Sequence, residues 1–249
     1  MTPEPAFLLH KRPYRETSAL VELLTLNHGR VRAVAQGVQR PGSRSRGRLQ
    51  PFSPLHVTWV GEGELKRLRL MESRGATALL AGEGLLCGLY ANELLTRTLH
   101  VELPVPEVFA FYTALLEALP RPAARAGGLR RLEVSLLEAL DAMPRFTTAE
   151  GGELDPQARY VLDPATRAFQ PGQPGLDGRT LRLLGAGDWD APGLAGPAKA
   201  VTRAALAPLL GSRPLRSREL MRQLAERRRA GLLGAGLLGS DPEASPRIE

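Results

Sequence analysis

Cysteine is nearly absent from this sequence, and aromatic residues are scarce. The single cysteine, Cys87, excludes an intramolecular disulfide and a cysteine-rich zinc site. It lies in the apolar stretch Leu85–Leu89, which predicts a buried structural thiol. Aromatic residues make up 5% of the 249 residues, so the core must consist mainly of Leu, Val and Ala, and few rings remain to stack on bases.

Long apolar runs are also missing. No stretch reaches the roughly 18 residues that a membrane-spanning helix needs. The N-terminus lacks the basic segment and apolar core of a signal peptide. The sequence therefore predicts a cytoplasmic protein with no membrane partner.

The motifs of common enzyme classes are missing or out of context. There is no phosphate-binding loop, no nucleophile elbow and no metal-ligand spacing among the four histidines. The pattern G-x-G-x-x-G occurs at 234–239, but an arginine cluster precedes it where a strand is required. Asp188-Trp189-Asp190 is the closest grouping of carboxylates, and its Gly/Pro-rich surroundings predict a turn. We therefore expect no catalytic residue, no cofactor and no bound metal.

Positive charge is present in excess and is unevenly distributed. The chain carries a formal net charge of +7, which favours a polyanionic partner. Residues 1–80 contain thirteen Lys or Arg and six acids, so their net charge equals the +7 of the whole chain. The sequence therefore places the expected polyanion contact near the N-terminus.

Alternating side chains between residues 6 and 75 predict about five short strands. Thr17–Leu26 and Arg30–Val38 flank Asn27-His28-Gly29, a hairpin signal, and Pro54–Val60 and Glu64–Met71 flank a second turn. Ala6–Lys11 precedes them. Five antiparallel strands in about 70 residues suit a small closed barrel, of which the OB-fold is the common nucleic-acid-binding form.

Basic residues gather on one face of this barrel and in the loop 39–48. The loop holds four arginines with Gly, Ser and Pro but no acid, which predicts a mobile arm that closes on a phosphate backbone. A solvated loop kept soluble by its charge is the alternative. The candidate DNA-binding residues are Lys11, Arg12, Arg15, Arg30, Arg32, Arg40, Arg44, Arg46, Arg48, Lys66 and Arg67.

Helical periodicity replaces the alternation after about residue 76. Apolar spacing predicts helices near 85–94, 108–119, 129–140 and 199–210, with a short one after Ser217 as N-cap. The predicted fold is α+β: an OB domain (1–78), a helical domain (79–145 and 198–225), an irregular insert with one hairpin (146–197) and a flexible tail (226–249).

Several collinear segments resemble RecO, the recombination-mediator DNA repair family of bacteria. They span roughly residues 6–222 in the family's order, which is more specific than any single motif. The segments are PYRETS (13–18), TLNHGRVRAVAQGV (25–38), LQPFSPL (49–55), GLYANELL (88–95), LRRLE (129–133) and PLLGSRPLRSREL (208–220).

The resemblance implies a DNA repair mediator that binds single- and double-stranded DNA and anneals complementary strands without ATP. It also implies binding to the acidic C-terminal tail of single-stranded-DNA-binding protein (SSB) and, with RecR, loading of RecA. Arg130 matches the arginine of the family that binds this tail; Arg131 and Arg203 are weaker candidates. Many relatives carry a four-cysteine zinc module in the insert, whereas residues 146–169 contain no Cys or His, so this chain resembles a zinc-free branch.

Three other functions stay open at this stage. A nuclease would need clustered carboxylates and a divalent metal. An RNA-binding module is compatible with the same barrel. A scaffold whose basic barrel meets an acidic protein would bind no nucleic acid.

Overall fold

The N-terminal region is a closed five-stranded barrel, which confirms the predicted OB-type architecture. The structure is a computed structural model that describes residues 2–75 and 77–237, without the side chains of Arg44 and of 228–237. The strand order is β1-β2-β3-β5-β4, and β3 pairs with β5 in parallel. The strands are β1 (Glu4–Tyr14), β2 (Ser18–Thr25), β3 (Gly29–Ala35), β4 (Pro54–Val60) and β5 (Leu65–Ser73).

Side chains alternate between the inner and outer faces of each strand, and the inward-pointing ones fill the barrel. In β3, Val31, Ala33 and Ala35 are buried, while the residues between them are half-buried. They pack with Leu8, Leu23, Val57 and other aliphatic residues of the remaining strands. Trp59 is the one aromatic ring in this core, as expected from the composition.

The arginine-rich loop is more ordered than the sequence suggested. Residues Arg44–Arg48 form the short helix α1, although we expected a mobile arm throughout 39–48. Leu49, directly after it, is buried in the barrel core, and the Arg48 guanidinium donates to the Met71 carbonyl (3.2 Å). The ammonium of Lys11 donates to the Leu49 carbonyl (2.7 Å). At its other end, the Gln39 amide donates to the Thr17 carbonyl (2.9 Å) and its side chain to the Ser18 carbonyl (3.0 Å), so hydrogen bonds at both ends and the buried Leu49 hold the segment.

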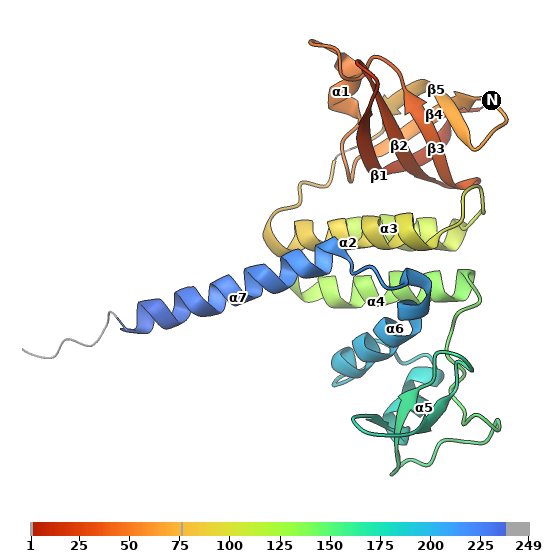
Figure 1. The fold of residues 1–249 in the computed structure, drawn as a ribbon, viewed down its shortest axis with the longest axis vertical. Coiled ribbons are helices and arrows are strands. Elements are labelled where there is room, and N and C mark those ends of the chain that lie inside the picture. Colours follow the sequence, from red (N-terminus) through yellow and green to blue (C-terminus); the bar gives the residue numbers. More distant parts are fainter. Residues whose placement is uncertain (1, 76, 238–249) are drawn as a thin grey trace, which may run out of the picture.

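A helical layer lies beneath the barrel (Figure 1). Barrel and helices share one apolar core, in which Phe7 contacts Phe109 and Tyr112 with ring centroids 5.4 and 5.2 Å apart. Asn92 donates to the Leu9 carbonyl (3.0 Å) and accepts from the Tyr112 hydroxyl (2.6 Å). The helices are α2 (Gly82–Thr98), α3 (Pro106–Ala118), α4 (Pro122–Ala139), α6 (Ala195–Leu210) and α7 (Arg216–Leu237).

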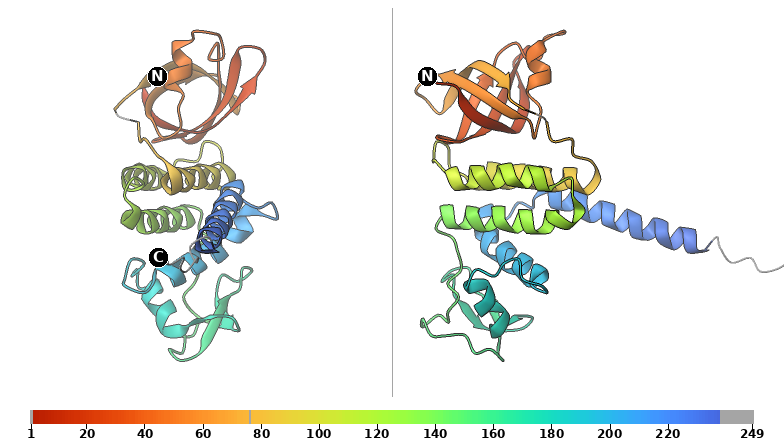
Figure 2. Two further views of the ribbon diagram at one scale, coloured as in Figure 1. Left: turned by 90° about the vertical axis from the view of Figure 1, so that its left-hand side faces the viewer. Right: turned by 180° about the vertical axis from the view of Figure 1, so that it is seen from behind.

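The insert has a small core of its own at the far end of the molecule (Figure 2). The predicted hairpin is present as β6 (Arg159–Leu162) and β7 (Phe169–Pro171), to which β8 (Leu176–Asp177) and α5 (Gly178–Gly185) are added. Phe146 contacts both Phe169 and Trp189 at ring-centroid distances of 5.5 and 6.0 Å. Asp188-Trp189-Asp190 lies outside helices and strands, in the predicted turn. Leucines of the insert and Ala198 and Val201 of α6 complete this core, so mixed aliphatic and aromatic packing holds the segment together.

Helix α7 differs from the short helix and flexible tail that we expected. It continues to Leu237 and projects from the body of the molecule (Figure 1). Residues 234–237 of the G-x-G-x-x-G pattern belong to this helix and do not follow a strand, and the rest of the pattern lies outside the described residues. Ser217 is not the N-cap, because α7 already begins at Arg216; its hydroxyl donates to Glu93 of α2 (2.7 Å).

The segment 99–105, which lies between α2 and α3, packs against the barrel and so attaches it to the helices. Val101 bridges to Arg30, and the Glu102 amide donates to the Arg30 carbonyl (2.8 Å). Lys66 on β5 forms an ion pair with Glu102 (2.6 Å). At Gly29 the backbone has φ +63° and leaves no space for a side chain, because a Cβ would lie 1.7 Å from the Leu103 carbonyl oxygen. The barrel is therefore fixed on the helical layer through a close backbone approach.

Gly29→Ala should lower the free energy of unfolding by about 2 kcal/mol or more, because the new methyl group needs both a strained φ and a displaced 99–105 segment. Chemical denaturation measures this. Gly63→Ala is the control, since a Cβ there meets no atom within 4 Å. Equal stability of the two variants would contradict the close approach.

Candidate nucleic-acid interface and peptide groove

Helix α1 lies at the end of the barrel that faces away from the helices (Figure 1), and the hollows beside it are lined by a group of cations. We call it the distal basic surface; all of its members are exposed. They come from β1, the segment before α1, α1 itself and β5: Lys11, Arg12, Arg40, Arg46, Arg48 and Arg69.

Two hollows flank α1 within this surface. Lys11, Arg12 and Arg46 line the one on the β1 side, which has a volume of about 280 Å³. Arg48 and Arg69 line the one on the β5 side, of about 180 Å³. Partial burial, and then the charge of Arg46, lower the pKa of Lys11. Such convergence of like charges favours an anion that can sit between them.

Two of the expected DNA-binding residues are not available at the surface. Arg30 forms an ion pair with Glu22 and donates to the Leu99 carbonyl (2.8 Å). Lys66 is only 7% exposed and is paired with Glu102. The expectation of a free cationic face at these positions was wrong, because segment 99–105 covers that side of the barrel.

The other predicted barrel cations have mixed surroundings. Arg67 is exposed on β5, and Arg32 is half-exposed with Glu64 at 3.8 Å. Arg15 lies in the β1–β2 turn with its guanidinium carbon 5.1 Å from the Tyr14 ring centroid. The Arg44 side chain lies outside the described residues. Arg69 was missed, although its spacing of two from Arg67 on a strand places both on one face.

A groove of about 590 Å³ opens between α2, α4, α6 and α7. Its apolar lining comes from Cys87, Leu129, Leu215 and Met221, among others. Its charged lining includes five cations and two acids: Arg130, Lys199, Arg203, Arg218, Arg222, Glu133 and Glu219. The structure thus brings Arg130 and Arg203 into one groove with an apolar floor.

Arg130 belongs to a buried network in the wall of this groove. It is only 7% exposed and forms two hydrogen bonds with Glu133, which is itself wholly buried. Arg130 also donates to the Thr202 hydroxyl, which donates in turn to Glu133. The Tyr90 hydroxyl donates to Glu133 as well (2.7 Å), and burial raises the pKa of Tyr90 strongly. Arg130 is therefore a packed and neutralised residue.

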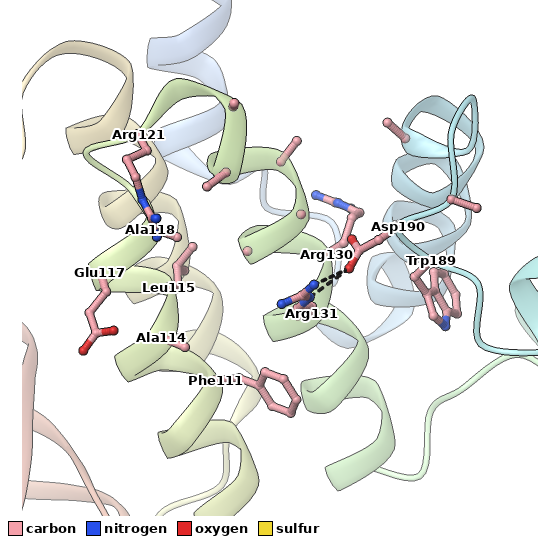
Figure 3. Close-up of a pocket in the computed structure, with 17 residues that line it drawn as sticks. Phe111, Ala114, Leu115, Glu117, Ala118, Arg121, Arg130, Arg131, Trp189 and Asp190 are labelled. Carbon is pink, nitrogen blue, oxygen red and sulfur yellow. Dashed lines mark hydrogen bonds and ion pairs between the residues drawn. The ribbon is translucent and has the colours of Figure 1, made fainter.

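Arg131 lies in a different cavity from Arg203. This second cavity, also of about 590 Å³, is lined by α3, α4 and the turn 189–191 (Figure 3). Arg131 faces Asp190 across it and forms an ion pair with a distance of 2.7 Å (Figure 3). The three arginines that we expected at one peptide site are thus divided between two cavities, although both cavities reach Arg130.

A second basic segment lies in the last third of the chain. Residues 199–237 contain nine Lys or Arg and two acids, a net charge of +7 equal to that of residues 1–80. Residues 81–198 contain ten Lys or Arg and fifteen acids. Four of these cations, Lys199, Arg203, Arg218 and Arg222, line the groove from α6 and α7.

Cys87 lies in the lining of the groove and is half-buried, not fully buried as predicted. Burial raises the pKa of its thiol. Across residues 2–75 and 77–237, no three His, Cys, Asp or Glu side chains are grouped as metal ligands. None of the helices described is long and apolar enough to cross a membrane.

Comparison with known proteins identifies relatives along nearly the whole chain. Residues 1–76 match the family described as Recombination protein O N terminal, and residues 80–219 match Recombination protein O C terminal. The chain is 43% identical to DNA repair protein RecO of Pseudomonas paraeruginosa (strain DSM 24068 / PA7) over 87% of this chain and 93% of that protein. DNA repair protein RecO of Thiobacillus denitrificans (strain ATCC 25259 / T1) is 38% identical over 90% and 92%, respectively. That of Pseudomonas putida (strain GB-1) is 41% identical over 89% and 98%.

Glu93→Gln should loosen the attachment of α7 and cost about 1–2 kcal/mol. The Glu93 carboxylate accepts from the Arg216 amide (2.8 Å), the Ser217 amide (2.9 Å) and the Ser217 hydroxyl. A glutamine keeps the shape but loses the charge. Faster hydrogen exchange of residues 216–221 measures the effect, and Glu138→Gln, at an exposed position of α4, is the control.

The same contact should depend on pH. Burial raises the pKa of Glu93, but the hydrogen bonds from Ser217 and Arg216 outweigh it, so that the pKa lies below its ordinary value of 4.5. The stabilisation is therefore complete above pH 4.5 and is lost as the pH falls through the lowered folded-state pKa. A stability difference between wild type and Glu93→Gln that persists in stronger acid would contradict this account.

Proposed function

This chain belongs to the RecO family of DNA repair proteins, and we propose that it is a recombination mediator that binds and anneals DNA strands without catalysing a covalent reaction. The observation that carries the proposal is the distal basic surface on a closed barrel. We propose single- and double-stranded DNA as its ligands. We propose that the protein acts in the cytoplasm, on the chromosomal DNA of the nucleoid.

Annealing requires two polyanions to approach each other. Cations offset the repulsion between phosphates while leaving base edges free to pair. The two hollows beside α1 support this role, because each holds guanidinium groups without an acidic residue in its lining. Neither ATP nor a metal ion is needed for such a step, and we propose that this chain uses neither.

We further propose that the groove between α2, α4, α6 and α7 binds the acidic C-terminal tail of SSB. Its apolar floor suits a terminal aromatic residue, and its rim of lysine and arginine suits the acidic residues and the terminal carboxylate. Such binding would bring the mediator to SSB-coated gaps. With RecR, it would then promote loading of RecA in the RecF pathway.

Replacing Arg40 and Arg46 together by Gln should slow the annealing of complementary oligonucleotides and weaken DNA binding. The dependence of log K on log salt should become shallower by about 1–2, because each lost phosphate contact releases fewer counterions. Fluorescence anisotropy and an annealing assay in EDTA measure both effects. The matched control is Arg145→Gln with Arg179→Gln, which removes the same charge from exposed positions near and within the insert.

Equal losses in the two double variants would indicate a general charge effect and contradict a dedicated surface. Cleavage that needs a divalent metal would favour a nuclease. Tighter binding to RNA than to DNA at equal salt would favour an RNA-binding module. Absence of binding to any nucleic acid would favour a scaffold.

Changing Lys199 and Arg203 together to Gln should reduce RecA loading on SSB-coated DNA while annealing of naked oligonucleotides is retained. Both residues are exposed in the groove lining and distant from the distal basic surface. The rate of DNA-dependent ATP hydrolysis by RecA, measured with RecR and SSB present, reports loading. Equal impairment of annealing and loading would contradict a separate site for SSB.

A further inference from the structure

The groove contains one arginine that is both held in place and left without a counter-charge. A peptide carboxylate is bound best by a guanidinium that is oriented in advance and still carries free donors. Arg130 does not meet the second condition, because two of its bonds go to the buried Glu133 carboxylate. Arg222 does not meet it either, since it is paired with Glu219 and Glu226.

Arg218, on the first turn of α7, meets both conditions. Its guanidinium donates to the Tyr90 hydroxyl (3.0 Å), and the guanidinium carbon lies 5.2 Å from the centroid of the Tyr90 ring. Among the described residues, no carboxylate lies within 4.0 Å of its nitrogens, so Arg218 forms no ion pair in the part of the chain that the structure covers. Arg218 is half-buried, next to the apolar Leu215 and Met221 of the same groove.

The direction of the hydrogen bonds explains why Arg218 is available. Glu133 accepts from Arg130, from Thr202 and from the Tyr90 hydroxyl, so its oxygens are already satisfied. Since the single Tyr90 proton goes to Glu133, the Tyr90 oxygen can only accept, and Arg218 supplies that donor. Tyr90 therefore fixes one edge of Arg218 without neutralising it, and the remaining N–H groups stay free.

Lys199 and Arg203 differ from Arg218 in that neither side chain forms a hydrogen bond or ion pair with the residues that the structure describes. Both are exposed on α6, and the structure gives neither side chain a carboxylate within 4.0 Å among the residues it describes. A flexible exposed cation attracts an anion over a distance but loses side-chain entropy when it binds. We expect these two to contribute attraction and Arg218 to contribute the specific contact.

We propose that Arg218 binds the terminal carboxylate of an acidic peptide in this groove, that Tyr90 is its positioning residue, and that Arg130 is a buried structural partner of Glu133. This inference rests on the proposed acidic-tail function of the groove. It assigns the anion-binding role to α7, at the point where Glu93 attaches that helix to α2.

The test compares two synthetic acidic peptides that end in Phe, one with a free carboxylate and one with a C-terminal amide. Binding to the full chain is followed by fluorescence anisotropy. The wild type should prefer the carboxylate by about tenfold, the scale of one charge-assisted contact. Arg218→Gln should abolish this preference. Arg203→Gln should weaken the binding of both peptides by the same factor and so keep the preference.

Two further variants separate positioning from folding. Arg216→Gln, on the same turn of α7 but outside the groove lining, should bind like the wild type. Tyr90→Phe should reduce the preference only in part, because the ring remains while the hydrogen bond is lost. Since Glu133 also loses a donor, this variant should unfold at a lower temperature, and its peptide binding is measured well below that temperature, where its helical circular dichroism matches the wild type.

The outcomes separate the inference from the function on which it rests. If the wild type prefers the carboxylate and Arg218→Gln does so equally, the assignment of Arg218 is overturned and the groove remains the peptide site. If the wild type binds neither peptide at low salt, both the groove function and the assignment are overturned. Loss of the preference in Arg218→Gln alone supports both.

Discussion

The buried carboxylate of Glu133 is the constraint around which the helical region is arranged. A wholly buried charge is costly unless its hydrogen bonds are satisfied, and here α4, α6 and α2 each supply a donor through Arg130, Thr202 and Tyr90. These requirements fix how the helices face one another. Helix α7 joins the same network through Arg218, so the groove that lies over it has a defined shape and a defined arginine. The hydrogen bonds that satisfy one carboxylate thus also orient the Arg218 guanidinium through Tyr90.

A second fixed connection lies between the barrel and the helices. The close approach at Gly29, the Arg30–Val101 bridge and the Lys66–Glu102 ion pair all join the same edge of the barrel to segment 99–105. The distal basic surface is at the opposite end of the barrel (Figure 1). If DNA binds that surface and a peptide binds the groove, as proposed, the two ligands would lie on different parts of the molecule, and neither would need to exclude the other.

The spacing of apolar residues predicted the helices and strands well, but it did not predict what surrounds the charged side chains. The strand Pro54–Val60 was predicted to the residue, and the α2–α4 helices follow from apolar spacing. Arg30 alternates onto the outer face, but a segment far along the chain covers it, which periodicity cannot reveal. Lys66 precedes the exposed Arg67 on β5, so alternation alone places it on the opposite face, with Leu68, where it is paired with Glu102. Arg130 resembles a solvated helix charge until Glu133 and Thr202 are seen around it. Helix α5 was missed in a Gly/Pro-rich segment, although Asp177 could have indicated it, since that side chain accepts from the Thr180 amide (2.8 Å) as an N-cap.

The scarcity of aromatic residues now has a structural meaning for DNA binding. Phe7, Phe109 and Tyr112 are used where the barrel meets the helices, and Phe146, Phe169 and Trp189 hold the insert together without cysteine. Near the distal basic surface, Tyr14 is half-exposed but already lies against Arg15. Within the described residues, little ring area is therefore left for stacking on bases, and contacts to phosphate must dominate. Binding of that kind is weak at high salt and indifferent to sequence. It leaves the bases of each strand free for a complementary partner, which is the condition that annealing requires.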